Sequence, residues 1–120
     1  SDFKKRELNR VIVEVNEAEF HQYLEEHERV AVFFHTPFCL NCSVARRMVE
    51  TILKQTSIDS PVISANLNMM PSVAEPLNVM TVPLLLFVYK GQPVEHYTSF
   101  GRVDELFYTF IRFFKQNFGK

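Results

Sequence analysis

Two cysteines, Cys39 and Cys42, are separated by only two residues, and the chain contains no others. A thiolate is both a nucleophile and a metal ligand, so this pair suits either thiol–disulfide exchange or metal binding. In exchange, one thiolate attacks a disulfide and forms a mixed disulfide. The second thiol then attacks that bond and releases the partner in reduced form.

Two interpretations other than exchange are open for the pair. Free cysteine is among the most buried residue types, so both could be core residues. A structural zinc site needs four ligands, and only His35 lies near in sequence, although a homodimer would bring two such pairs to one metal or cluster. We favour a redox-active pair and expect no metal ligands in this chain, because the segments around the pair also predict a strand-helix-strand unit, in which a C-x-x-C is typical of redox-active dithiols.

The spacing of apolar residues after the pair predicts where the thiols lie. Apolar residues recur at helical intervals from Cys42 to Leu53, which puts Cys39 at or just before a helix N-terminus. The unpaired N–H groups and the positive end of the helix dipole stabilise a thiolate there, so Cys39 is the favoured nucleophile. Cys42, one turn deeper, is expected to be less exposed and to attack the mixed disulfide formed at Cys39.

The other elements follow from periodicity, caps and turn residues. Asn16 with Glu19 predicts a capped helix that ends near Arg29. The consecutive apolar residues 30–34 are typical of a strand covered on both faces. Strands are further expected over 11–15, 61–66, 84–89 and, after a turn at 90–93, 94–100, and helices from about 39 to 53, over 70–78 and over 102–114. This order predicts a mixed α/β domain with helices on both faces of a partly parallel sheet.

Length and composition indicate one domain spanning 1–120, since 120 residues with 47% hydrophobic and 22% charged content suit an ordinary globular fold. A net charge of -1 argues against a nucleic-acid or anionic-membrane binder. The longest apolar stretch, 82–89, is too short to span a bilayer, and the opening residues do not form a signal peptide. Because the chain begins at Ser1, an export signal or anchor preceding it is left open.

Four segments together resemble the thioredoxin family across nearly the whole chain. They are Phe33-Phe34-His35-Thr36-Pro37-Phe38-Cys39-Leu40-Asn41-Cys42, then Thr81-Val82-Pro83-Leu84-Leu85-Leu86-Phe87, then Lys90-Gly91-Gln92-Pro93-Val94, and Gly101. The resemblance implies the thioredoxin fold, a five-stranded mixed sheet flanked by four helices. It also implies that Pro83 is cis and packs against the dithiol. It further implies that the backbone of Val82 pairs with an extended substrate peptide, with Phe38 and Thr81 at the same substrate-binding surface.

The chain departs from the family pattern around the dithiol. The usual Trp-Cys-Gly-Pro-Cys is Phe38-Cys39-Leu40-Asn41-Cys42 here, so the redox potential should differ. The buried aspartate that many thioredoxins hold beneath the resolving cysteine aligns with Phe33, and its lysine partner aligns with Ser64. His35 is the candidate that favours a thiolate or carries its proton. The alternative is that His35 simply packs in place of the family's aromatic residue.

The sequence thus predicts a thiol:disulfide oxidoreductase that exchanges the Cys39/Cys42 dithiol with disulfides in protein substrates. It needs no bound cofactor, and a reductase or a low-molecular-weight thiol supplies its electrons. The alternative is a non-catalytic thioredoxin-fold module that binds peptides or a partner. We expect a monomer in the cytoplasm, because a dithiol without structural disulfides suits a reducing compartment.

Overall fold

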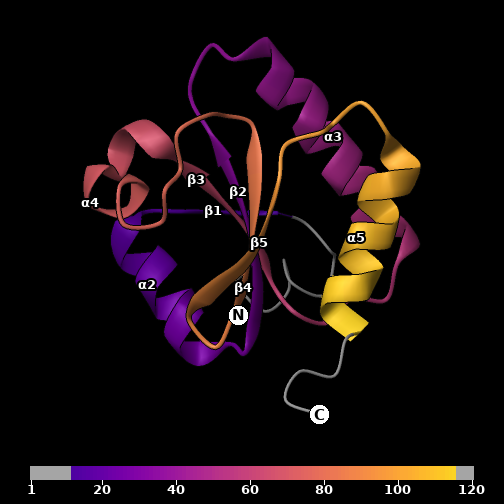
Figure 1. Cartoon of the computed structure of the whole chain (residues 1–120), viewed down its shortest axis with the longest axis horizontal. Coiled ribbons are helices and arrows are strands. Elements are labelled where there is room, and N and C mark those ends of the chain that lie inside the picture. The colour runs from indigo at the N-terminus through magenta and orange to yellow at the C-terminus, as the bar shows by residue number, and fades with distance from the viewer. Residues whose placement is uncertain (1–11, 116–120) are drawn as a thin grey trace.

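The computed structural model describes residues 12–115. In chain order the elements are β1 (Val13–Val15), α2 (Glu17–Glu26), β2 (Arg29–His35), α3 (Leu40–Gln55), β3 (Val62–Asn66), the 3-10 turn η1 (Leu67–Met69), α4 (Pro71–Ala74), β4 (Leu84–Tyr89), β5 (Gln92–Tyr97) and α5 (Val103–Lys115). The strands form one sheet in the order β1-β3-β2-β4-β5 (Figure 1). β3 runs parallel to β1 and β2, whereas β4 is antiparallel to β2 and β5. The predicted five-stranded mixed sheet with four helices is therefore confirmed.

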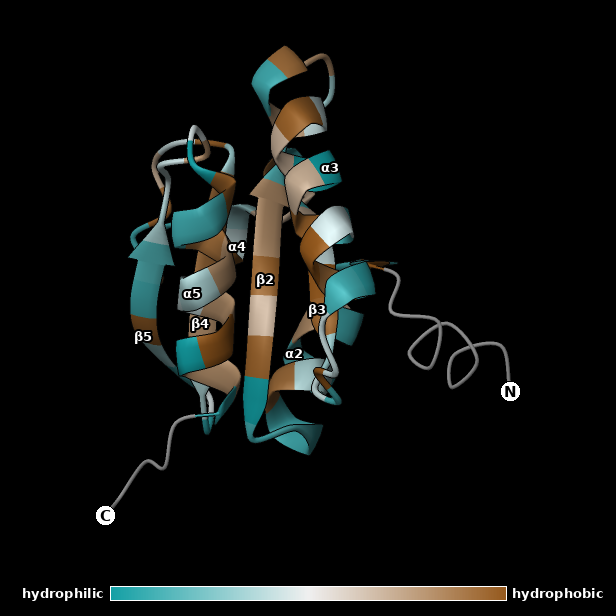
Figure 2. Ribbon diagram, turned by 90° about the vertical axis from the view of Figure 1, so that its right-hand side faces the viewer, coloured by the Kyte–Doolittle hydropathy of each residue, from teal (hydrophilic) through white to brown (hydrophobic). Residues whose placement is uncertain are grey.

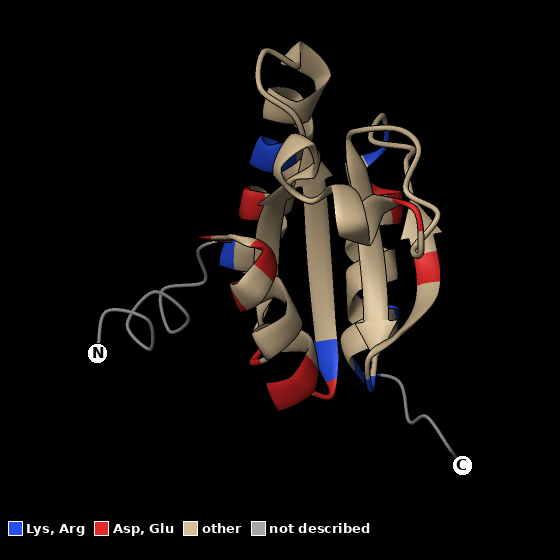
Figure 3. Ribbon diagram, turned by 90° about the vertical axis from the view of Figure 1, so that its left-hand side faces the viewer, with Lys and Arg blue, Asp and Glu red and all other residues tan. Residues whose placement is uncertain are grey.

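The helices cover the two faces of the sheet in pairs. α3 and α5 lie on one face, turned toward the viewer in Figure 2, and α2 and α4 lie on the other, turned toward the viewer in Figure 3. β2 runs through the middle, and its residues Val30 to Phe34 are all buried because both faces are covered. β5, teal over most of its length in Figure 2, is the polar edge strand. The consecutive apolar residues of β2 were thus a correct indicator of a strand buried on both sides.

The first helix begins as predicted and ends earlier than predicted. Asn16 Oδ1 accepts the N–H of Glu19 at 2.8 Å, and Glu19 Oε1 accepts the N–H of Asn16 at 2.9 Å. The helix stops at Glu26 rather than near Arg29, since His27 is extended and Arg29 already pairs with Tyr89 in the sheet. Pairing with a neighbouring strand outweighs the helical pattern of the last three residues.

The final hairpin is tighter than predicted. Lys90 and Gly91 both have positive φ, 50° and 78°, and form a two-residue turn whose handedness matches the twist of the strands. β5 therefore begins at Gln92, inside the predicted turn, and ends at Tyr97 rather than at 100. Pro93 is accommodated because β5 is an edge strand.

The predicted helix over 70–78 is also shorter in the structure. A 3-10 turn precedes it, α4 itself covers only Pro71–Ala74, and the chain continues as turns to Asn78. Pro76 lacks an N–H and cannot continue the hydrogen-bond pattern of the helix. At the other end of the described chain, α5 follows the predicted range closely.

Candidate active site

Cys39 is the N-cap residue of α3, directly after the loop that leaves the end of β2. Its Sγ accepts the backbone N–H of Cys42 at 3.1 Å, and its carbonyl oxygen accepts the N–H of Ser43 at 3.3 Å. The predicted placement at a helix N-terminus is therefore confirmed. In the reduced form the same N–H group and the helix dipole would stabilise a thiolate on Cys39.

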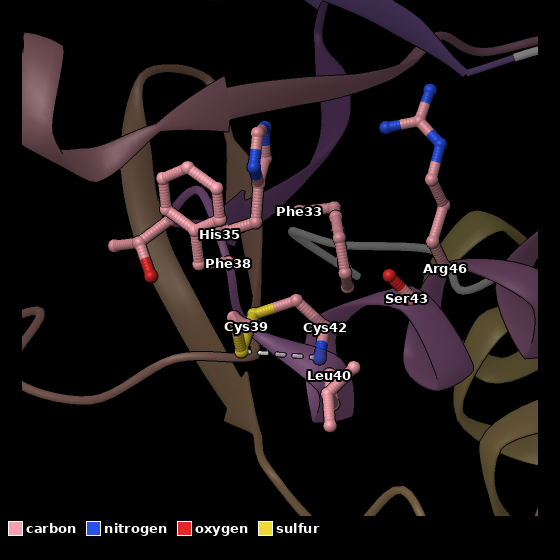
Figure 4. A pocket seen from close by; sticks show the side chains of 9 residues that line it. Phe33, His35, Phe38, Cys39, Leu40, Cys42, Ser43 and Arg46 are labelled. Carbon is pink, nitrogen blue, oxygen red and sulfur yellow. Dashed lines mark hydrogen bonds between the residues drawn. A yellow bond between two sulfur atoms is a disulfide. The ribbon is translucent and has the colours of Figure 1, made fainter.

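Cys39 and Cys42 are joined by a disulfide, with their Cα atoms 5.2 Å apart (Figure 4). The two sulfurs differ in exposure. Cys42 is only 5% exposed and belongs to the core cluster beneath α3, whereas Cys39 is partly buried at the edge of that cluster. An incoming thiol or disulfide therefore has better access to Cys39 than to Cys42.

The loop before Cys39 presents apolar side chains to solvent. Phe38 is fully exposed and has φ 61°, in the left-handed region that L residues with a bulky side chain rarely adopt. Leu40, on the other side of Cys39, is 85% exposed. A strained backbone and exposed apolar side chains beside a reactive disulfide are typical of a contact surface for another molecule.

A hollow of about 300 Å³ opens beside the disulfide (Figure 4). Its lining residues come from the end of β2, the following loop and the first two turns of α3: Phe33, His35, Thr36, Phe38, Cys39, Leu40, Cys42, Ser43 and Arg46. Phe33 is 1% exposed and packs in the same cluster as Cys42. The side chain packed beneath Cys42 is therefore an aromatic ring.

Ser64 lies beside Phe33 in the sheet register, and it is fully buried. Its Oγ accepts a hydrogen bond from Arg46 Nη1 at 3.1 Å. A buried hydroxyl without a partner would be costly, and Arg46 satisfies it while its guanidinium stays partly exposed at the hollow. The sequence pointed to Ser64 only because it aligns with the family's lysine, and the hydrogen bond from Arg46 was missed.

His35 Nε2 lies 3.0 Å from Oε2 and 3.2 Å from Oε1 of Glu14, on β1. Its ring also stacks on Phe33, with ring centroids 6.1 Å apart. Burial raises the pKa of Glu14, but hydrogen bonds from His35 and Ser64 and the nearby charges of His35 and Arg46 outweigh it, so that pKa is lowered overall. Glu14 was missed in the sequence because it is 21 residues from His35 and no local pattern joins them.

The Val82–Pro83 peptide bond is cis. Phe34 pairs with Leu84, so this bond lies beside the end of β2 from which the dithiol loop departs. Val82 packs against both core clusters, and Thr81 is exposed. Cys39, Cys42, His35 and Phe38 line the hollow, whereas Thr81, Val82 and Pro83 are not among its lining residues.

Within 12–115, no three His, Cys, Asp or Glu side chains gather as a metal site. No helix in that range is long and apolar enough to cross a membrane.

Comparison with known proteins decides the family. The family model described as Thioredoxin matches residues 11–112. The chain belongs to the thioredoxin family. It is 30% identical over 91 residues to the thioredoxin-like protein YusE of Bacillus subtilis, covering 70% of this chain and 85% of that protein. It is 33% identical over 86 residues to thioredoxin 1 of Synechococcus elongatus, covering 71% and 80%.

Solved structures of the thioredoxin family share the fold. A mutant thioredoxin from Halobacterium salinarum superposes with a TM-score of 0.75 at 22% identity, over 88% of this chain and 92% of that one. Thioredoxin f from spinach chloroplast gives a TM-score of 0.75 at 18% identity, over 88% and 89%. At these identities the likeness shows the fold alone.

Proposed function

We propose that this thioredoxin-family protein is a thiol:disulfide oxidoreductase that exchanges the Cys39/Cys42 dithiol with disulfides in protein substrates. The observation that carries the proposal is the asymmetry of the pair. Cys39 caps α3 with its sulfur on a backbone N–H, and Cys42 is buried one turn deeper. Such an arrangement suits an accessible nucleophile and a protected resolving thiol.

In the proposed reaction, the Cys39 thiolate attacks one sulfur of a substrate disulfide, and the other substrate sulfur leaves as a thiolate. The Cys42 thiol then loses its proton and attacks Cys39 Sγ. The second substrate sulfur leaves, so that the substrate is reduced by two electrons and the Cys39–Cys42 disulfide forms. A reductase or a low-molecular-weight thiol returns two electrons to the protein.

The substrate side of the proposal uses the surface around Cys39. Phe38 is exposed beside the disulfide, and apolar contact with the substrate would compensate for its strained backbone. Val82 and Thr81 precede the cis Pro83 at the same end of the sheet, and we assign the Val82 backbone to pairing with an extended substrate segment. We assign Pro83 to packing against the dithiol, and we propose a monomeric domain spanning 1–120 that acts in the cytoplasm.

A redox titration against glutathione or dithiothreitol, read by thiol alkylation, tests the exchange. We expect one reversible two-electron couple that involves both cysteines. A potential near about -270 mV would indicate a disulfide reductase, and one between about -180 and -120 mV an oxidase or isomerase. Failure to form the intramolecular disulfide at any ratio of oxidised to reduced reagent would contradict the proposal.

Single-cysteine variants test the roles within the pair. Cys39→Ser should abolish exchange, and Cys42→Ser should accumulate mixed disulfides with substrates, because the resolving attack is lost. Val44→Ala, an exposed change on the same helix, is the matched control and should leave exchange unaltered.

The second candidate is a non-catalytic binding module. It is favoured by the replacement of a charged pair beneath the dithiol with Phe33 and Ser64, together with the exposed Phe38 and Leu40. Such a module would keep its partner after either cysteine substitution and would trap none in the Cys42→Ser variant. The same experiment therefore distinguishes the two functions.

A further inference from the structure

The resolving step requires a group that takes the proton of the buried Cys42 thiol. Among the side chains that line the hollow in the described part of the chain, His35 alone carries an imidazole, whose neutral form has an unprotonated ring nitrogen. Arg46 stays protonated, the hydroxyls of Thr36 and Ser43 are poor bases, and the rest of the lining apart from the two cysteines is apolar. An imidazole ordinarily titrates between about pH 6 and 7, which suits such a role.

The contact with Glu14 determines which nitrogen of His35 is free to act. Both carboxylate oxygens lie within 3.2 Å of Nε2, so Nε2 carries the hydrogen and donates it to Glu14. In the neutral ring Nδ1 is then unprotonated and is the acceptor. A base held by a third group in this way is the general arrangement for activating a nucleophile.

The polar groups around His35 and Glu14 keep Glu14 charged. Arg46 Nη1 lies 3.7 Å from Glu14 Oε1, and Arg46 Nε lies 3.9 Å from Glu50 on the same helix. From β3, Ser64 hydrogen-bonds Glu14, and Asn66 is the register partner of His35. The lowered pKa of Glu14 agrees with a carboxylate at neutral pH, which is the form that orients and stabilises an imidazolium.

The sulfurs and the imidazole face the hollow from different directions. In Figure 4 the ring rises from β2 away from the disulfide. The hollow of about 300 Å³ has room for several water molecules, each of which occupies about 30 Å³ in the liquid. A proton that moves between Cys42 and His35 would therefore pass through water in the hollow rather than by direct contact.

We propose that, given the disulfide exchange above, His35 accepts the Cys42 proton through water in the hollow, with Glu14 as its positioning residue. The proton leaves Cys42 Sγ and reaches His35 Nδ1. The Cys42 thiolate attacks Cys39 Sγ, the Cys39–Cys42 bond forms, and the electron pair of the broken mixed disulfide leaves with the substrate thiolate. The imidazolium then returns its proton to the substrate thiolate or to solvent, so the step needs no further oxidant.

Stopped-flow reaction of the fully reduced protein with 5,5′-dithiobis(2-nitrobenzoate) separates the two attacks. The first coloured thiolate reports attack by Cys39, and the second reports resolution by Cys42. In the wild type we expect the second rate to carry an inflection in the range of imidazole titration, separate from any inflection that ionisation of Cys39 gives the first rate. This comparison needs no variant, and a second phase without that inflection would overturn the proposal.

Three variants sharpen the test. His35→Gln should slow the second phase at pH 7.5 by at least about tenfold and remove the inflection; the loss is below the usual 10²–10⁴ because bulk water competes. Glu14→Gln should slow it by about threefold and move the inflection to lower pH, since the imidazolium loses its carboxylate. Glu50→Gln removes a neighbouring charge that pairs with Arg46 and should leave the second phase within twofold of wild type.

The outcomes distinguish this inference from the proposed function. Absence of a second thiolate in the wild type would contradict the exchange reaction itself. Two phases whose second rate and pH profile survive His35→Gln unchanged would leave the exchange standing and overturn the role of His35. If Glu50→Gln slowed the second phase as much as Glu14→Gln does, the positioning role of Glu14 would be overturned.

Discussion

The two faces of the sheet are packed differently, although the same strands build both. The face under α2 and α4 is filled by buried apolar residues such as Phe34, Leu86 and Met70. The face under α3 and α5 contains a core rich in aromatic rings, with Phe87, Phe110 and Phe113 together. At one end, however, this second face also holds the disulfide, and beside it a polar row formed by Glu14, Ser64 and Arg46.

The candidate active site therefore lies where apolar packing gives way to polar side chains. The residues paired across β1, β3 and β2 change from the charged Glu14 to the buried Ser64 to the buried Phe33. The polar side chains are retained because each has a hydrogen-bond or ionic partner. β2 itself bears no Lys, Arg, Asp or Glu after Arg29, and in Figure 3 the strand is tan beyond its start.

Phe33→Asp should be the most damaging of the changes that test this contrast. It removes a buried ring and places a carboxylate in its site, and we expect it to lower the free energy of unfolding at pH 8 by about 5 kcal/mol or more. Burial raises the pKa of such a carboxyl. The cost of ionising it in the folded state is therefore absent below its pKa in the unfolded chain, near about 4, and grows as pH rises.

Phe33→Asn is the control for that variant, because it loses the same ring without a titrating group. Urea unfolding at pH 4 and pH 8 should show a gap between the two variants that opens from near zero to about 2 kcal/mol. A gap that does not change with pH would mean that the site is open to water rather than part of the core.

Phe87→Ala and Leu86→Ala compare the two cores at neighbouring positions. Phe87 contacts Phe110 and Phe113 at centroid distances of 5.4 and 5.0 Å, and we expect its loss to cost about 3–5 kcal/mol. Leu86→Ala, on the opposite face, should cost about 2–5 kcal/mol. Denaturant unfolding measures both, with Val94→Ala on the edge strand as an exposed reference; a Leu86 variant as stable as that reference would contradict a second packed face.

Phe38→Gly tests the exposed loop before Cys39. Glycine adopts φ 61° without strain, so we expect stability to rise by about 1 kcal/mol. At the same time KM for protein disulfides should rise several-fold, because the exposed ring is gone. Phe38→Ala keeps the strained conformation and should show only the KM effect, whereas unchanged KM in both variants would argue against substrate contact.

Glu14→Gln should have the smallest effect on stability. The lowered pKa of Glu14 contributes stability that is present above its unfolded value and is lost as pH falls through the folded one. Because the side chain is 50% exposed, we expect the variant to lose under about 1 kcal/mol at pH 7. The difference from wild type should shrink in unfolding experiments as the pH falls below the unfolded value, and a difference that grows on acidification would contradict the assignment.

Most of the fold could be predicted because its signals are local. The Asn16 cap, the apolar run of β2 and the helical repeat after Cys42 each depend on residues close in sequence. The errors lie at element ends. At Glu26 the pairing of Arg29 with the distant Tyr89 outweighed the helical pattern, and at Lys90-Gly91 a two-residue turn lets β5 begin earlier than predicted.

The sequence by itself determined the position of Cys39 at a helix start and the deeper position of Cys42, because both depend on one turn of helix. Only the tertiary structure decided what surrounds them. The pairing of Glu14 with His35, and the bond between Arg46 and Ser64, join residues 21 and 18 positions apart. Such contacts depend on the strand order β1-β3-β2 and its register, which bring side chains from separate strands onto one face of the sheet.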